Sequence, residues 1–467
     1  GTSVERAYDE LLNGLKGKKV IVAVIDTGLD IDHLSLSNNI WINKDEKLNR
    51  KDDDKNGYID DIYGWNYLGT SYNETRDMTR ILRDNQVDNI KYSLVEEEIR
   101  KEIKKSNEQL NILNYYIQIL EFSKGVISEN LNNTKFTIED VNKIKTEDEK
   151  LNRAKNIYID FESIGYTKEY LNEGIEQYND FINYHFNIDF NGRTSNDNIY
   201  DINDTDYGDS NINNIKDSEC HSTHVSGIIS GDRNNKKGNK GINNLVEIMA
   251  LRAIPNGDEY DKDVARAIRY AVDNGAKIIN GSFGKYFSSN PEWVIDAIRY
   301  ASKKDVLVVA AAGNESKDLD LLSNDNYPND QFFNKNEFSD TFIKVGASTI
   351  NLNENFTAYF SNYGKINVDI FAPGVDIYSS VPNDKYKFQD GTSMASPVVS
   401  GIASLIMSYF PKLSAKKVKE IILKSGIDID LKIGNLGSNK HFREYSKSGK
   451  LINAYNALIL ASKSKRE

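Results

Sequence analysis

Residues 19–25 read Lys-Val-Ile-Val-Ala-Val-Ile and give the first indication of the fold. After the lysine the run is apolar and mostly β-branched at consecutive positions, which is typical of a strand buried on both faces of a parallel sheet. The run ends in the polar turn Asp26-Thr-Gly28. Ligands of open α/β sheets bind at the carboxyl ends of strands, so Asp26 stands where a functional side chain is expected.

The same pattern returns in the second half of the chain. Residues 261–274 and 291–303 have helical spacing, and they lead into apolar strands at residues 276–280 and 305–312 respectively. Strands that alternate with helices of about a dozen residues form βαβ units. The sequence therefore predicts a doubly wound α/β fold in three layers, with a mostly parallel sheet between two layers of helices.

Between about residue 70 and residue 200 the chain changes to long charged segments with helical spacing and few glycines. Capping residues predict three helix starts there, at Ser93 with Glu96, at Thr146 with Glu149, and at Thr167. We expect an inserted all-α subdomain at residues 70–200, which separates residues 1–69 from residues 201–467 of the α/β domain. It either decorates the surface or acts as a lid or docking arm.

Composition limits the classes of function. The 467 residues include 59 basic and 70 acidic side chains, for a net charge of -11, and both signs are mixed along most of the chain. We expect no nucleic-acid partner, because phosphate binding needs a basic face, and no membrane span, because no apolar stretch approaches roughly 18–20 residues. Cys220 is the single cysteine, so an intrachain disulfide is excluded. The first residues lack signal-peptide features, so we expect a processed chain.

Ser393 is a candidate nucleophile. Residues 390–397, Asp-Gly-Thr-Ser-Met-Ala-Ser-Pro, deliver it to the first turn of an apolar helix, whose N-terminal N–H groups can face an anion. A hydroxyl is a poor nucleophile at neutral pH and needs a base together with a carboxylate that orients the base. His221, at the start of a helix of small and apolar residues, and Asp26 can supply these two roles.

Asn314 is a candidate oxyanion donor. It follows the apolar strand at residues 305–312 in the turn Ala-Gly-Asn. A side-chain amide at a strand end can donate to the oxyanion of a tetrahedral intermediate, and losing one such donor typically costs roughly 100- to 1000-fold in turnover.

Together these motifs resemble those of the subtilisin family, in which the order along the chain is Asp, His, oxyanion Asn, Ser. The matching segments are residues 24–28 (Val-Ile-Asp-Thr-Gly), 221–225 (His-Ser-Thr-His-Val), 312–314 (Ala-Gly-Asn) and 391–397 (Gly-Thr-Ser-Met-Ala-Ser-Pro). The resemblance covers about residues 18–68 and 200–460 and leaves out the helical segment. It implies the subtilisin type of doubly wound sheet.

The resemblance also implies an activity and a setting. Asp26, His221 and Ser393 would form the triad of a serine endopeptidase that hydrolyses protein or peptide substrates through an acyl-enzyme, with Asn314 at the oxyanion. Family members usually fold with an N-terminal propeptide that later inhibits them, and they are usually exported. We therefore expect a mature enzyme with an extracellular, periplasmic or cell-surface location. The rival reading is a protein that keeps the fold but only binds a partner through its helical insertion.

By the same resemblance, four residues belong to the substrate-binding site: Ser282, Phe283, Gly284 and Asn326. The first three would form a wall of the primary specificity pocket and pair with the substrate backbone as an added strand. Asn326 would lie near the pocket floor, where the family often has a smaller residue.

Residues 52–61, Asp-Asp-Asp-Lys-Asn-Gly-Tyr-Ile-Asp-Asp, predict a structural calcium site. Carboxylate or amide side chains stand at alternate positions before a turn glycine, as they do in calcium loops. The expected ligands are Asp52, Asp54, Asn56 and Asp60, with the carbonyl oxygen of Tyr58. The alternative is a charged turn without an ion. The high-affinity calcium site usual in the family is not expected, because Ser35 stands where one of its carboxylates would be.

Cys220, His221 and His224 suggest two weaker alternatives. The two histidines have the spacing of metal ligands on one helix face, so with the thiol they could bind zinc. That hypothesis leaves Ser393 and Asn314 without a role. Separately, Cys220 is either a bystander or a thiol that makes the site sensitive to thiol reagents.

Overall fold

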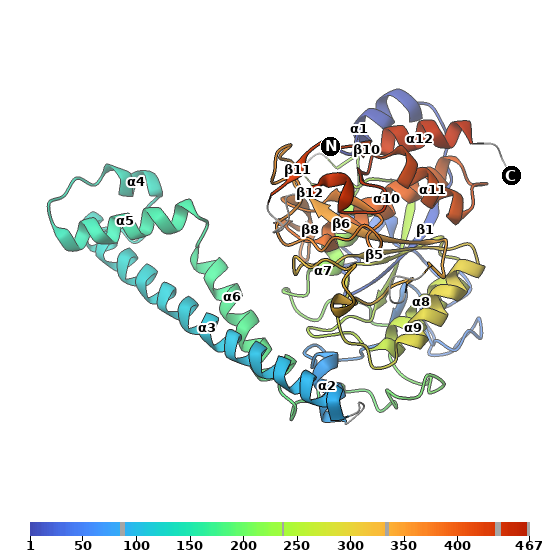
Figure 1. Cartoon of the computed structure of the whole chain (residues 1–467), viewed down its shortest axis with the longest axis horizontal. Helices are drawn as coiled ribbons and strands as arrows, with labels where there is room; N and C mark the ends of the chain where they lie inside the picture. Colours follow the sequence, from blue (N-terminus) through green and yellow to red (C-terminus); the bar gives the residue numbers. More distant parts are fainter. Residues whose placement is uncertain (85–88, 236–237, 332–335, 435–439, 465–467) are drawn as a thin grey trace. The chain divides into compact units, whose positions relative to one another are not determined.

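The computed structural model describes the chain except for residues 85–88, 236–237, 332–335, 435–439 and 465–467 and the side chains of residues 89–92. Its internal contacts divide the chain into two compact units (Figure 1). Unit 1 consists of Gly1–Tyr72 and Arg193–Glu467, and unit 2 consists of Asn73–Gly192. Unit 2 falls within the segment 70–200 that the sequence predicts to be inserted.

Unit 1 is built on a nine-stranded sheet with the order β10-β13-β7-β6-β5-β4-β1-β3-β2. Neighbouring strands run parallel except for β10 and β13. The strands are β1 Val20–Asp26, β2 Gly64–Asn66, β3 Val246–Arg252, β4 Ile278–Gly281, β5 Leu307–Ala311, β6 Phe342–Ser348, β7 Ile370–Pro373, β10 Ile427–Asp428 and β13 Lys450–Leu451. The chain passes from β3 on one side of β1 to β4 on the other, so the carboxyl end of β1 lies where the order reverses.

Strand β1 confirms the prediction for residues 19–25. Val22 and Val24 pack into the apolar cluster on one face of the sheet, whereas Ala23 and Ile25 pack into the cluster on the other face. Successive side chains of a strand point to opposite faces of the sheet, so a run that is apolar at every position needs burial on both faces. Both layers of helices are therefore needed to cover it.

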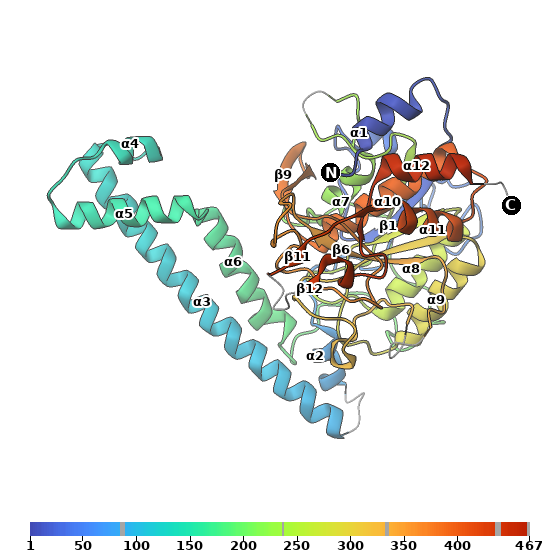
Figure 2. The same cartoon turned by 45° about the horizontal axis from the view of Figure 1, so that its top comes forward.

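One helical layer consists of α7 His221–Ser230, α10 Thr392–Tyr409, α11 Ala415–Ser425 and α12 Ala454–Lys463. The opposite layer consists of α8 Asp261–Asp273 and α9 Pro291–Lys303, which lie side by side in Figures 1 and 2. These last two helices confirm the predictions for residues 261–274 and 291–303. The fold is thus doubly wound, with three layers and a mostly parallel sheet.

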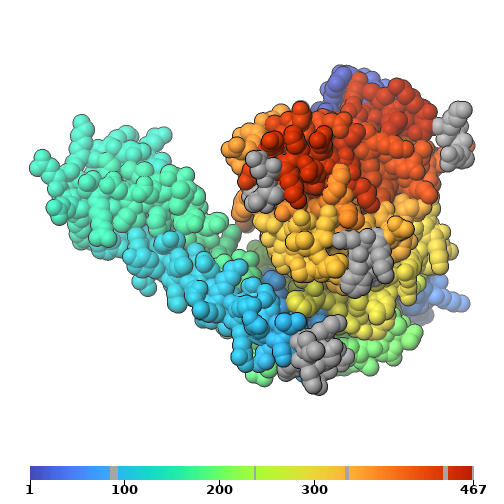
Figure 3. Space-filling model, viewed as in Figure 1, coloured from blue at the N-terminus to red at the C-terminus, as the bar shows by residue number. Residues whose placement is uncertain are grey.

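Two smaller features complete unit 1. Strands β8 Ile377–Val381 and β9 Lys385–Gln389 form an antiparallel hairpin, and β11 Lys432–Ile433 pairs with β12 Lys440–His441. The first helix, α1 Val4–Ala7, packs beside α12, so the blue and red ends of the chain adjoin on the surface in Figure 3. No helix among the described residues has the length and apolar character needed to cross a bilayer.

Unit 2 is all α-helical. Its helices are α2 Asp77–Arg83, α3 Asn89–Leu131, α4 Ile138–Lys143, α5 Glu149–Ser163 and α6 Lys168–Asp180, followed by one π-helical turn, Phe181–His185. Figure 2 shows α6 along the long helix α3 and α5 crossing it, and a small core joins them, with Leu120 and Ile127 from α3, Leu151 from α5 and Leu171 from α6.

The predicted helix starts in unit 2 have different outcomes. Thr167 caps α6 as expected, because its side chain accepts a hydrogen bond from the Tyr170 N–H. The start at Thr146 is wrong by two residues, since Asp148 caps α5. Ser93 is also wrong as a start, because α3 already begins at Asn89. A capping pattern inside a long helix has no free N–H groups to satisfy, so it marks no boundary.

Candidate active site

Asp26 and His221 meet at the carboxyl end of the sheet. Asp26 is the last residue of β1 and is 1% exposed, while His221 is the first residue of α7. The imidazole Nδ1 lies 2.7 Å from Asp26 Oδ1. The same oxygen accepts a hydrogen bond of 2.7 Å from the Thr27 N–H. The two predicted residues therefore form an oriented carboxylate and imidazole pair although they are 195 positions apart.

This contact fixes the role of each imidazole nitrogen. An ionised carboxylate can only accept, so Nδ1 carries the proton and Nε2 is left as the acceptor that a general base requires. Burial opposes protonation of the ring, but the Asp26 carboxylate outweighs it, so the pKa of His221 lies above its ordinary value.

Ser393 is the second residue of α10, whose N-terminal turn begins at Thr392. Its hydroxyl donates to the carbonyl oxygen of Ser282 at 3.0 Å, and the Ser282 hydroxyl donates in return to the Ser393 carbonyl oxygen at 2.9 Å. Ser393 is thus held on the segment that follows β4. Its hydroxyl donates to Ser282 and not to His221, and catalytic hydrogen bonds often form only when substrate is bound.

Asn314 presents its amide nitrogen beside the nucleophile. Its Oδ1 accepts from both the backbone N–H and the hydroxyl of Thr392, each at 2.9 Å, so Nδ2 is turned the other way. A Cβ built on Gly391 would lie 3.5 Å from the Ser393 nitrogen and 3.6 Å from Asn314 Nδ2. The Ser393 N–H and the Asn314 amide nitrogen therefore both lie near the space beside Gly391 that the missing side chain leaves free.

Thr392 is a functional residue that the sequence did not single out. Besides holding Asn314, its hydroxyl accepts from the Gly313 N–H at 3.0 Å. Its position between the glycine and the serine of the motif was the only available signal, because the partner it orients is 78 positions away.

The four expected substrate-binding residues lie together. Lys285, next to Gly284, forms an antiparallel bridge with Tyr327, next to Asn326. A Cβ on Gly284 would lie 3.4 Å from Asn326 Nδ2 and 3.5 Å from its Oδ1. The buried Lys344 donates from Nζ to Asn326 Oδ1 at 2.9 Å, which holds the amide group beside Gly284.

Phe283, the remaining member of this group, is partly buried and packs against the apolar cluster beneath α8 and α9. Residues 282–284 therefore link Ser393 to Asn326, because Ser282 exchanges hydrogen bonds with Ser393 and Gly284 adjoins Asn326.

The acidic loop brings together only part of the predicted calcium set. Oxygens of Asp52 and Asp54 lie within 4.8 Å of each other and of Glu46, which the sequence analysis missed because it precedes the loop. Asp60 instead accepts from the backbone N–H groups of Asn49 and Arg50 at 2.8 and 2.9 Å. The three carboxylates are the hard oxygen donors that calcium prefers, although Glu46 and Asp52, like Asp60, also accept from backbone N–H groups of the loop.

Of the other two predicted ligands, Asn56 is engaged within the loop through its side chain and Tyr58 is held through its ring. Asn56 donates from Nδ2 to Asp54 and Asp61 at 3.1 and 3.0 Å, and its Oδ1 accepts from the Tyr58 N–H at 2.8 Å. The Tyr58 ring packs against Trp65 and Tyr270. Tyr58 thus anchors the loop to the unit 1 core.

The histidine pair is divided between two environments. His224 Nε2 lies 3.0 Å from the Lys387 carbonyl oxygen in β9, and burial lowers the pKa of His224 to about 4. His221 faces Asp26, and Cys220 Sγ accepts from Gln389 at 3.3 Å. Among the described residues these three side chains form no cluster with metal-binding spacing, so the structure offers nothing to the zinc alternative.

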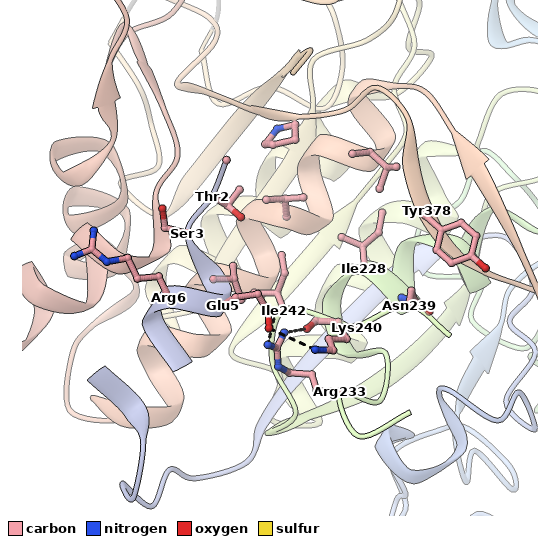
Figure 4. Close-up of a pocket in the computed structure, with 16 residues that line it drawn as sticks. Thr2, Ser3, Glu5, Arg6, Ile228, Arg233, Asn239, Lys240, Ile242 and Tyr378 are labelled. Carbon is pink, nitrogen blue, oxygen red and sulfur yellow. Dashed lines mark hydrogen bonds and ion pairs between the residues drawn. The ribbon is translucent and has the colours of Figure 1, made fainter. Parts of the chain in front are cut away.

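A separate pocket of ≈ 450 Å³ lies beside the N-terminal segment (Figure 4). Arg233 donates to Glu5 at 2.5 Å and to the Gly241 carbonyl oxygen at 2.6 Å, while Ile228 and Ile242 supply apolar lining. The Arg233 guanidinium thus joins Glu5 to the segment that contains Gly241.

Ser35 stands where the family's high-affinity calcium site would have a carboxylate. Its hydroxyl pairs with the hydroxyl of Tyr386 at 2.7 Å, and a serine offers no carboxylate to a cation.

Comparisons with known proteins find relatives of this chain. The model of the subtilase family matches residues 17–445. The thermophilic serine proteinase of Bacillus sp. (strain AK1) is 36% identical over 261 residues, which cover 56% of this chain and 55% of that protein. The cell wall-associated protease of Bacillus subtilis (strain 168) is 35% identical over 234 residues, which cover 50% of this chain and 24% of that protein. The matches thus span about half or less of these relatives' length.

Two solved structures are also similar. The prenylagaramide maturation protease PagA has a TM-score of 0.42 at 28% identity, covering 51% of this chain and 82% of its own. A structure of the subtilase cytotoxin SubAB has a TM-score of 0.44 at 24% identity, covering 53% of this chain and 78% of its own. Both scores are low, so the fold assignment rests on the sheet and helices of unit 1.

Proposed function

The chain belongs to the subtilase family, and from that premise we propose that it is a serine endopeptidase that cleaves protein substrates through an acyl-enzyme. Ser393 attacks the peptide carbonyl while His221 Nε2 takes its proton. His221 then returns that proton to the leaving amine, and water, activated by the same imidazole, releases the acyl group. Asp26 holds the imidazole and stabilises its protonated form.

The observation that carries this proposal is that three separate segments lie at the carboxyl ends of the neighbouring parallel strands β1, β4 and β5. The imidazole oriented by Asp26, the Ser393 hydroxyl at a helix N-terminus, and the Asn314 amide turned by Thr392 supply a base, a nucleophile and an oxyanion donor. Each element alone has an ordinary structural explanation. Their combination is the arrangement that acyl transfer requires.

The proposal is tested by labelling with a fluorophosphonate probe, which reacts only with an activated serine. We expect one equivalent of label on the folded protein and none on Ser393→Ala, and we expect cleavage of an unfolded protein such as casein by the first but not by the second. A folded protein that takes up no label and cleaves no peptide library would refute catalysis and favour the rival function, a fold that only binds partners.

The environment of Asn326 supports a second element of this proposal, a polar primary specificity pocket. Its Oδ1 accepts a hydrogen bond from the buried Lys344, so a polar side chain is held beside Gly284. We propose that residues 282–284 pair with the substrate backbone and that Asn326 limits the depth of the pocket. Profiling the cleavage sites of a peptide library with the native protein and with Asn326→Gly tests this assignment.

We also propose a structural calcium ion in the acidic loop, held by Glu46, Asp52 and Asp54. When bound, the ion would neutralise three carboxylates that otherwise repel one another, and so stabilise the loop. Isothermal titration with calcium tests it, with Asp54→Asn as the weakened variant. Equal heats for the two proteins would contradict this site.

Family membership supports two further proposals about setting. We propose that the protein is exported, since a relative in Bacillus subtilis is a cell wall-associated protease, and that an N-terminal propeptide of its own gene product inhibits it before maturation. Fractionation of the producing cells, and inhibition assays with the peptide encoded upstream of Gly1, test these two points separately.

A further inference from the structure

Glu219 lies two residues before His221, in a position that the proposed mechanism does not use. Its side chain is 2% exposed, and its carboxylate accepts three hydrogen bonds. Oε1 accepts from the Gly28 N–H and from Arg252 Nε, both at 2.9 Å, and Oε2 accepts from the Ile215 N–H at 2.7 Å. A buried carboxylate persists only when it is paired and hydrogen-bonded, so this site has a specific partner set.

Arg252 is the ionic partner and is itself fully buried. It is the last residue of β3 and pairs in register with Asp26 of β1. Its Nη1 donates to Asn66 Oδ1 and the Gly69 carbonyl oxygen at 3.1 and 3.0 Å, and its Nη2 donates to the Ser71 carbonyl oxygen at 2.8 Å. The planar guanidinium therefore joins several acceptors in one fixed arrangement, which a lysine could not reproduce.

The hydrogen bonds of this pair bracket the catalytic histidine. On one side of His221, Glu219 binds the N–H of Gly28 in the turn that follows Asp26. On the other side, the Ser222 N–H donates to the Thr27 hydroxyl at 3.1 Å. The segment that carries Asp26 and the first turn of α7 are thus joined on both sides of the Nδ1 to Oδ1 contact.

We propose that Glu219 and Arg252 are positioning residues, whose buried ion pair fixes the turn after Asp26 against the first turn of the helix that begins with His221. The inference rests on the proposed function, because it assigns the pair a role in orienting the general base. Neither residue touches the reacting atoms. Their effect is transmitted through the distance and angle between Asp26 and His221.

Charge-conserving substitutions test this role, because they change geometry and leave the net charge alone. Arg252→Lys keeps the positive charge but loses the planar guanidinium and its fixed set of N–H donors. Glu219→Asp shortens the carboxylate side chain by one methylene. Displacing catalytic groups by about 1 Å costs on the order of 100-fold, so we expect kcat to fall about 10- to 100-fold while KM changes less than about twofold. Values are normalised to fluorophosphonate-titrated sites.

The pH profile of kcat/KM supplies the readout that separates positioning from mere stability. The groups that face His221 are Asp26 from β1 and His224 one turn along α7, and the Asp26 carboxylate is the one that raises the pKa of His221. A longer contact weakens that effect, so the acid limb should move to lower pH in both variants. Lys419→Arg, at another buried ion pair, is the matched control.

The outcomes are distinguishable. For Lys419→Arg we expect a lower melting temperature, a native kcat per titrated site and an unmoved acid limb. The positioning role would be overturned if Arg252→Lys or Glu219→Asp gave that same result. If one variant does not fold, the other decides. Failure of the native protein to label or cleave would instead refute the proposed function and leave this inference without a reaction.

Discussion

Replacing Thr392 by valine tests how the oxyanion donor is held. The substitution keeps the shape of the side chain and removes the hydroxyl, which donates to Asn314 Oδ1 and accepts from the Gly313 N–H. The amide then keeps one of its two anchors, the backbone N–H of Thr392. The nearby Ser393 and its helix are unchanged, so the perturbation is confined to the orientation of Asn314 and to the N–H of Gly313, the residue before it.

The structure sets the expected sizes. Removing the donor in Asn314→Ala should lower kcat by about 100- to 1000-fold, or about 2.7–4 kcal/mol. Loss of one of two neutral hydrogen bonds that orient the donor is worth about 1 kcal/mol, so Thr392→Val should lower kcat about fivefold and leave KM unchanged. Both are measured with a chromogenic peptide substrate on enzyme whose active sites have been titrated.

The double variant provides the decisive comparison. If Thr392 acts through Asn314, Thr392→Val should cost much less in the Asn314→Ala background than in the native enzyme, because no amide remains to be oriented. The reasoning is refuted if Thr392→Val costs the same in both backgrounds, or if it leaves kcat at the native value.

Three further predictions concern titration, calcium and the core. Because protonated His221 cannot act as a base, kcat/KM should fall as the pH drops through the raised pKa of His221, above the ordinary value of about 6.5, and Asp26→Asn should move that limb to lower pH. The same raised pKa stabilises the folded state at pH below the unfolded-state value, and the contribution is lost as the pH rises through the folded-state pKa, which pH-dependent melting can detect. Chelation by EGTA should lower the melting temperature, and much less so for Asp54→Asn; equal shifts would contradict a calcium ion there. Ile343→Ala in β6, where the side chain is fully buried, should cost about 2–5 kcal/mol in denaturant unfolding, and a cost below about 1 kcal/mol would contradict its place in the core.

The sequence predicted what depends on local pattern. A run that is apolar at every position could only be a strand covered on both faces, so β1 was placed correctly and Asp26 with it. Pro291 and the apolar spacing behind it fixed the start of α9. The residues that determine each of these elements lie within about a dozen positions of one another, so no distant partner is needed to predict them.

What the sequence could not predict depends on partners that are distant in the chain. Thr392 orients an amide 78 positions away, and Arg252 binds a carboxylate 33 positions away. Asp60 matched the spacing of a calcium ligand, yet its carboxylate accepts N–H groups of a turn that the spacing does not describe. Such roles are set by tertiary contacts, and the residue type alone is compatible with several of them.

The two ends of unit 1 that flank unit 2 explain how 195 positions can separate Asp26 from His221 without loosening their contact. Thr194 donates from its backbone N–H to the Ser71 hydroxyl at 2.9 Å, and the hydroxyl groups of the two residues lie 3.0 Å apart. Closing a flexible loop costs only about 0.6 kcal/mol more in entropy for each doubling of its length, so a long insertion at a joint that is held by hydrogen bonds adds little to the cost of closing it. Arg252 binds the carbonyl oxygen of the same Ser71. The joint that accommodates the insertion and the ion pair that we assign to positioning are therefore one connected network within unit 1.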